Sequence, residues 1–258
     1  MSKNYTDLSG RVAVVVGGTS GLGRTIALGL AEAGAAVVAT GRRQELVDEI
    51  AAEIQNVGRE SLSHSVNVAD RKSIDALRDA VVARFGGVDV LVNAAGKTKR
   101  TPTKDLPEQE WQDILDTNLT GMLRCCQSFY EPLAASKRGR IVNIASLSSF
   151  VGLYEVTAYC ASKAAVLSLT RSLAVEWARV GINVNAIAPG VFRTDLNSAL
   201  LDGTERGREF LTRTPMKRFG KADELIGAAV LLASDAASYI TGQSIAVDGG
   251  FLASGVNS

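Results

Sequence analysis

Short runs of branched apolar residues alternate with longer amphipathic segments along the whole chain. We expect β-strands at 11–16, 36–40, 61–66, 88–92, 140–145, 182–187 and 244–247. Apolar residues recur at helical spacing over 22–33, 44–57, 71–85, 108–136, 157–179 and 222–233. Pro132 is expected to kink or end the helix that contains it. Strict alternation of strand and helix predicts an α/β fold with a doubly wound parallel sheet and right-handed crossovers.

The length predicts one domain. A chain of 258 residues is enough for one large α/β core and short for two. No low-complexity linker interrupts the alternation, so residues 1–258 are read as a single domain, with the less regular stretch 189–220 as a substrate loop. Hydrophobic residues make up 46% of the chain but aromatics only 5%, which means that Ala, Val, Ile and Leu fill most of the core.

Charge and cysteine content exclude several functional classes. The net charge is +1, from 28 basic and 27 acidic residues, and it indicates neither a nucleic-acid-binding nor a membrane-binding surface. The chain has three cysteines without metal-ligand spacing and one histidine, so we expect reduced thiols and no metal site. The first residues lack an apolar signal sequence, and no apolar run reaches the ~20 residues that span a bilayer. We therefore expect a cytoplasmic protein.

A glycine-rich turn joins the first expected strand to the first expected helix. In a dinucleotide-binding (Rossmann-type) fold this turn holds the pyrophosphate, because glycines allow a tight turn and close approach of backbone N–H groups. The helix N-terminus adds partial positive charge. The alternative is a tight connection without a ligand. The residues expected at the pyrophosphate are Gly17, Thr19, Ser20, Gly21, Leu22 and Gly23.

The end of the second expected strand bears on the choice between NAD and NADP. An acidic residue at this place binds the adenosine ribose, whereas an arginine accommodates the 2′-phosphate of NADP. This chain has Arg42 and Arg43 and no acid there, so we expect NADP, with NAD as the alternative cofactor. The alternative is that both arginines are solvated residues at the start of a helix and bind no phosphate.

Tyr159 and Lys163 lie four positions apart in an expected helix and therefore share one face. A nearby ammonium stabilises a phenolate, so we expect Lys163 to lower the pKa of Tyr159 toward working pH. Tyr159 then serves as general acid or base toward an alkoxide or alcohol. Ser146 follows the fifth expected strand and is placed to hold a carbonyl oxygen by a hydrogen bond.

These motifs occur together with Asn93-Ala94-Ala95-Gly96, with Asn118 and with Pro189-Gly190 followed by Thr194. From about residue 8 to 251 the chain resembles the short-chain dehydrogenase/reductase family. The resemblance implies a nicotinamide-dependent oxidoreductase in which Lys163 also binds the nicotinamide ribose and Asn118 anchors a water. It implies a homotetramer, with a dimer as the alternative. The further residues implied to bind the cofactor are Asn67, Val68, Asn93, Ala94, Ala95, Gly96, Pro189, Gly190, Val191 and Thr194.

Cations gather where the substrate is expected. Lys97, Lys99 and Arg100 follow Gly96, and Arg193 follows the Pro-Gly turn. They form either a binding site for a substrate carboxylate or phosphate, or a solvated charged loop. The stretch 194–220 is similar to gluconate and deoxygluconate dehydrogenases of the same family, which favours a small polar substrate such as a sugar acid. A 3-oxoacyl-[acyl-carrier-protein] reductase and a non-catalytic dinucleotide-binding protein are the alternatives.

Overall fold

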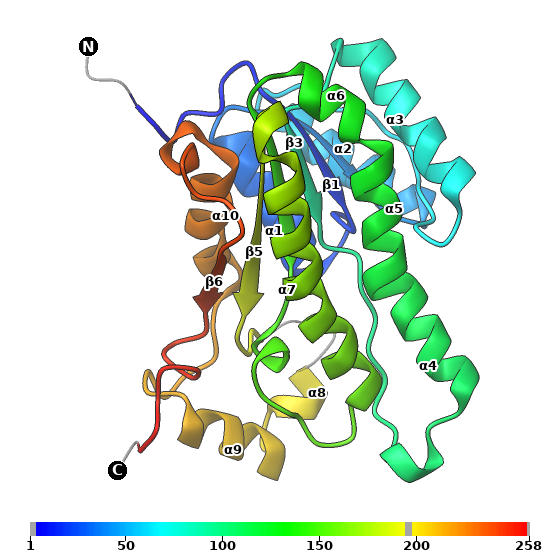
Figure 1. The fold of residues 1–258 in the computed structure, drawn as a ribbon. Coiled ribbons are helices and arrows are strands. Elements are labelled where there is room, and N and C mark those ends of the chain that lie inside the picture. Colours follow the sequence, from blue (N-terminus) through cyan, green and yellow to red (C-terminus); the bar gives the residue numbers. More distant parts are fainter. Residues whose placement is uncertain (1–3, 194–197, 257–258) are drawn as a thin grey trace.

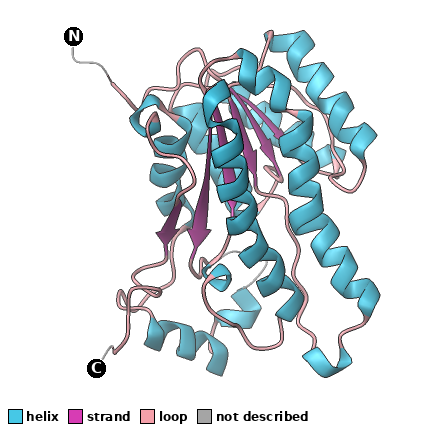
Figure 2. Cartoon of the chain, in the orientation of Figure 1, coloured by secondary structure: helices cyan, strands magenta, loops and turns pink. Residues whose placement is uncertain are grey.

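The computed structural model describes residues 4–193 and 198–256, and these residues form a sheet of six parallel strands between two layers of helices (Figures 1 and 2). The strand order is β2-β1-β3-β4-β5-β6, so the chain reverses direction across the sheet between β1 and β3. The strands are β1 Val12–Val16, β2 Ala36–Thr40, β3 Val90–Asn93, β4 Gly139–Ile144, β5 Ile182–Pro189 and β6 Ser244–Val247. Ligands of such sheets bind at the carboxyl ends of the strands where the order reverses.

Helices cover both faces of the sheet. One layer contains α1 (Gly21–Glu32), α2 (Gln44–Asn56) and α10 (Ile226–Ala233), and the other contains α3 (Arg71–Phe85), α5 (Gly121–Ser128) and α7 (Thr157–Trp177). Neighbouring residues of β1 divide between the layers, because Val15 packs with α1 and Val14 packs with α5 and α7. This two-sided burial explains why the strands are continuously apolar.

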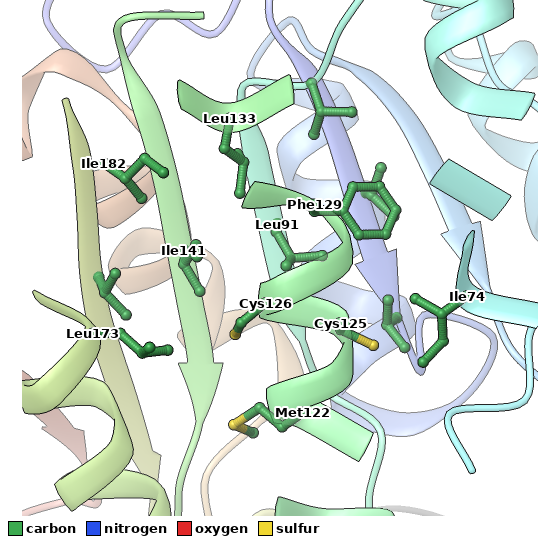
Figure 3. Close-up of a cluster of buried hydrophobic side chains, with 14 of the residues drawn as sticks. Ile74, Leu91, Met122, Cys125, Cys126, Phe129, Leu133, Ile141, Leu173 and Ile182 are labelled. Atoms are coloured by element: carbon green, nitrogen blue, oxygen red, sulfur yellow. The ribbon is translucent and has the colours of Figure 1, made fainter. Parts of the chain in front are cut away.

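The layer around α5 forms one of the two apolar cores (Figure 3). Met122, Cys125, Cys126 and Phe129 line up along this helix and contact the sheet. The cysteines are free thiols, as expected, and burial raises the pKa of Cys126 to about 12. They serve as small apolar side chains.

The segment 61–66 is not a strand, contrary to the expectation from its sequence. Its backbone meets β2 only near its ends, where Val37 N donates to Glu60 O and Val66 N donates to Gly41 O. Between these bonds, the Ser61 hydroxyl donates to Val37 O at 2.7 Å. A side chain thus occupies an acceptor that a continuous ladder would use, and the segment runs beside the edge of the sheet without joining it.

The helix expected over 108–136 is divided into pieces. It consists of α4 (Glu108–Leu115), a π-helical turn (Asp116–Thr120), α5 and α6 (Tyr130–Ala135). The break predicted from Pro132 is found at Phe129, so that the proline falls in the first turn of α6, where a missing N–H costs nothing. The π-helical turn was not predicted.

The stretch 189–220 contains the short helices α8 (Ser198–Leu201) and α9 (Glu205–Arg213). Its ends meet in a bridge between Phe192 and Gly220. Residues 194–197 of the expected loop lie outside the described residues. Within the described chain, no helix is long and apolar enough to cross a membrane.

Candidate active site

A cleft of about 690 Å³ opens at the carboxyl ends of the strands. Loops that follow β1, β2, β3, β4 and β5 line it, together with the start of α7 and parts of α8 and α9. Most of the residues expected at the site line this one cleft. They are Gly17, Thr19, Ser20, Gly21, Leu22, Gly23, Arg42, Arg43, Asn67, Val68, Ala94, Ala95, Gly96, Ser146, Tyr159, Lys163, Pro189, Gly190 and Val191.

The glycine turn contains two kinds of glycine. Gly17 has φ +83°, and a Cβ there would lie 2.4 Å from Ala95 N; a Cβ on Gly23 would lie 2.1 Å from Gly17 O. These two are required by packing of the turn. Gly21 has φ +51° and no atom within 4 Å of its Cβ position, so it borders open space in the cleft.

The first turn of α1 offers unpaired N–H groups at the same place. Its N-cap residue, Ser20, makes no side-chain hydrogen bond to the helix, and the first turn has no acidic residue. Such a helix start favours an anionic group by its backbone donors and its dipole. The donor set and the space beside Gly21 therefore fit a dinucleotide pyrophosphate.

Tyr159 and Lys163 project from the first two turns of α7 toward each other. The Lys163 Nζ atom lies 5.8 Å from the centre of the Tyr159 ring and donates a hydrogen bond of 2.6 Å to Ile144 O. Burial lowers the pKa of Lys163 to about 8. The lysine remains mainly protonated at neutral pH, but its proton is more readily released than that of a solvated lysine.

The prediction that the pKa of Tyr159 is lowered is wrong for this structure. Burial raises the pKa of Tyr159, and a hydrogen bond with Ser146 offsets only part of this effect. The ammonium of Lys163 is held by the carbonyl of Ile144, at some distance from the ring, so desolvation of the phenolate dominates. A protonated phenol at the wall of the cleft is suited to donate a proton.

Asn118 lies in the π-helical turn and is completely buried behind the cleft rather than lining it. Its Oδ1 accepts from Lys97 N at 2.8 Å, and its Nδ2 donates to Lys97 O at 2.9 Å. A Cβ on Gly96 would lie 3.4 Å from Asn118 Oδ1 and 3.7 Å from Lys163 Nζ, so the three residues meet at one point. π-Helical turns are frequent at functional sites because they redirect a side chain in this way.

Ser162 is a site residue that sequence reasoning missed. Its hydroxyl donates to Tyr159 O at 2.7 Å and accepts from Asn118 Nδ2 at 3.0 Å, in a fully buried position. It thereby connects the turn that carries Asn118 to the helix that carries Tyr159. Its place directly before Lys163 was the only signal in the sequence.

Asn93, which was expected to bind cofactor, does not line the cleft. Asn93 is 3% exposed, and its Nδ2 donates to Asn143 Oδ1 at 2.9 Å and to Cys126 Sγ at 3.3 Å. The side chain of Asn93 points into the sheet and the α5 layer because residues of a strand alternate between faces, so its role is to join β3 to β4. Thr194 lies outside the described residues.

The cations near Gly96 do not form a free positive cluster. Each of the four expected side chains is paired with an acidic side chain that comes from another segment. The pairs are Lys97–Asp113 (3.8 Å), Lys99–Glu110 (2.6 Å), Arg100–Glu155 (2.6 Å) and Arg193–Asp202 (2.7 Å). Of the two alternatives, the ion pairs favour a charged surface loop over a binding site for a substrate anion. Arg206 of α9, which was not predicted, also lines the cleft.

The described part of the chain has no group of three or more His, Cys, Asp or Glu side chains arranged to hold a metal ion. A Tyr–Lys pair, a serine and a glycine turn at the carboxyl ends of parallel strands form one site. A family model described as enoyl-(acyl carrier protein) reductase matches residues 16–252. The chain belongs to the short-chain dehydrogenase/reductase family. As a short-chain dehydrogenase/reductase it is an oxidoreductase.

Individual members of the family are similar over nearly the whole chain. The 2-dehydro-3-deoxy-D-gluconate 5-dehydrogenase of Dickeya dadantii is 41% identical over 256 residues, which cover 98% of this chain and 100% of that protein. The 3-oxoacyl-[acyl-carrier-protein] reductase FabG of Staphylococcus aureus is 41% identical over 239 residues, 92% of this chain and 96% of that one. A gluconate 5-dehydrogenase from Burkholderia cenocepacia, solved in complex with NADP and tartrate, superposes with a TM-score of 0.93 at 37% identity, covering 97% of this chain and 98% of that chain.

Proposed function

We propose that this protein transfers a hydride between NADP(H) and the carbonyl or secondary alcohol of a small polar substrate, a sugar acid. The observation that carries the proposal is the pair of Tyr159, which is partly exposed, and the buried Lys163 beside Ser146, at the wall of a cleft that extends to Arg42 and Arg43. The similarity to sugar-acid dehydrogenases and the NADP in a solved relative support it.

The residues that line the cleft have separate roles toward the cofactor and the substrate. When bound, the nicotinamide supplies or accepts the hydride. Gly21 and the N-terminus of α1 hold the pyrophosphate, and Arg42 binds the 2′-phosphate in a charge-assisted contact. Asn67, Val68, Ala94, Ala95, Gly96, Pro189, Gly190 and Val191 shape the rest of the cofactor site.

In the reductive direction, Ser146 donates a hydrogen bond to the substrate oxygen and Tyr159 donates its proton to that oxygen as negative charge develops. The ammonium of Lys163 then lies beside the phenolate that remains, and its depressed pKa lets it return a proton toward Tyr159. Asn118 fixes the position of the backbone around Lys97. The family resemblance implies that Asn118 also anchors a water, which resupplies Lys163 with a proton.

The first test is a fluorescence titration of the purified protein with NADPH and with NADH, followed by NADPH oxidation with a panel of keto acids and ketones. We expect tighter binding of NADPH and turnover of a keto-sugar acid. Equal or tighter binding of NADH would reject the role of Arg42. Turnover of an acetoacetyl thioester in place of the acids would instead favour the 3-oxoacyl-[acyl-carrier-protein] reductase, a function supported by the similarity to FabG. Binding without any turnover would favour a non-catalytic dinucleotide-binding protein.

We also propose a cytoplasmic homotetramer. The three free thiols fit a reducing compartment. The long helix α7 exposes 82% of Val175 on the face turned away from the sheet, which fits a subunit contact. Light scattering coupled to gel filtration distinguishes a tetramer from the dimer and the monomer.

A further inference from the structure

Arg206 differs from the other cations at the substrate end of the cleft. Lys97, Lys99 and Arg100 also line the cleft, but each is paired with a carboxylate. Arg206 makes no ion pair with any of the described residues. Its charge is therefore available for a ligand.

The Arg206 side chain is held in place by neutral groups. Its Nη1 donates to Tyr154 O at 3.3 Å, and its guanidinium carbon lies 5.5 Å from the centre of the Phe210 ring, one turn further along α9. The side chain is half-buried. One of its five N–H groups is used by Tyr154, so the remaining donors form a partly positioned fork of the kind that binds carboxylates in two parallel bonds.

The surroundings of Arg206 define the ligand further. The cleft that Arg206 lines also has apolar side chains in its wall, and these include Leu153, Val156, Val191, Phe192, Leu201 and Phe210. Tyr154, which holds the guanidinium, belongs to the segment that leads directly into Tyr159. A cation without a carboxylate partner, in contact with the segment that leads to the proton donor, favours a substrate with one carboxylate away from its reacting carbon.

We propose that Arg206 binds the carboxylate of the substrate and thereby selects keto-sugar acids over neutral ketoses. This inference rests on the proposed function, because it concerns the substrate of the same site. Arg206 is then a specificity-determining residue, carried by a helix more than forty residues after Tyr159 in the sequence.

The test compares Arg206→Gln with Arg206→Lys and with the control Arg208→Gln. Arg208 lies on the same helix but is exposed and does not line the cleft. Kinetics are measured with NADPH and two probes, 5-keto-D-gluconate and the neutral 5-keto-D-fructose. Calorimetric binding of D-gluconate and of neutral D-sorbitol to the NADPH-bound protein provides a readout that needs no turnover.

We expect Arg206→Gln to raise KM for the keto acid and Kd for gluconate by about 10- to 100-fold, because one charge-assisted contact with the carboxylate is lost. The neutral probes should change by less than about 3-fold, Arg206→Lys should recover part of the loss, and Arg208→Gln should behave as wild type.

Equal losses for the acidic and neutral probes would overturn the inference, as would a wild-type protein that binds gluconate no better than sorbitol. In both of these cases NADPH oxidation by neutral ketones would still leave the proposed oxidoreductase function in place. Failure of the proposed function has a different signature, which is the absence of NADPH oxidation with every probe.

Discussion

Replacing Gly21 by alanine separates the two requirements on the glycine turn. Gly21 has φ +51°, so an alanine there adopts a left-handed conformation that costs about 1–2 kcal/mol of folding free energy. No atom lies within 4 Å of the new methyl group, so packing adds no further cost. The methyl group occupies the space beside the N-terminus of α1 that the proposal assigns to the pyrophosphate, and we expect NADPH to bind about 10- to 100-fold more weakly.

Gly86→Ala is the matched control. Gly86 ends α3 with φ +80° and also has nothing within 4 Å of its Cβ position, but it does not line the cleft. Both variants should lose a similar free energy of unfolding, which corresponds to a fall in Tm of roughly 2–8 °C. Gly17→Ala should lose more, about 2–5 kcal/mol, because its Cβ would lie 2.4 Å from the backbone of Ala95.

Thermal unfolding and NADPH fluorescence titration measure the two quantities independently. If Gly21→Ala binds NADPH as tightly as Gly86→Ala does, the turn does not hold the pyrophosphate. If Gly17→Ala unfolds no earlier than Gly86→Ala, then the close packing of the turn against Ala95 is not a source of stability.

Three further variants test the chemistry of α7. Tyr159→Phe should reduce turnover at least about 100-fold and leave the Kd of NADPH within about 3-fold, because only the proton donor is lost. Stopped-flow kinetics measure the turnover and a fluorescence titration measures the Kd. Retained turnover would contradict the mechanism. Ser162→Ala should lower the free energy of unfolding by about 1–2 kcal/mol in urea, because it removes the hydroxyl between Asn118 and Tyr159 O, and an unchanged urea midpoint would show that the connection is unimportant. Burial lowers the pKa of Lys163 from 10.5 to about 8, so between these values the unfolded chain holds a proton that the folded chain has released. Folding stability, measured relative to Lys163→Met, should therefore rise by about 3 kcal/mol from pH 7 to pH 10.5, and parallel pH profiles of the two proteins would refute the buried charge.

Much of the fold could be predicted because it depends on local patterns. The strands at β1, β2, β4 and β5 are apolar runs, and the glycine turn and the Tyr–Lys spacing are fixed within a few residues of sequence. The segment 61–66 has the composition of a strand, but the Ser61 hydroxyl takes up an acceptor on its neighbour, and this depends on a tertiary contact. Periodicity alone does not contain that information.

The predictions for the site were incomplete or wrong where distant segments of the chain determine the environment of a side chain. The sequence left open whether the cations after Gly96 bind a substrate anion, because their acidic partners come from α4 and from the loop before α7. The raised pKa of Tyr159 results from its burial rather than from its spacing to Lys163. Arg206 was missed because its contact with Tyr154 joins two segments that are 52 residues apart.

The π-helical turn at Asp116–Thr120 constrains how the length of this chain can vary. A π-turn contains one residue more than an α-turn of the same helix. Deleting one residue within the turn would restore an ordinary helix and keep the stretches on either side of it in register. Deleting one residue of α4 would instead rotate everything that follows by about 100°, the angle between successive helical residues. That rotation would turn Met122, Cys125, Cys126 and Phe129 away from the sheet and withdraw Asn118 from Lys97. A change of length by a single residue is therefore less disruptive at the π-helical turn than in the helix before it.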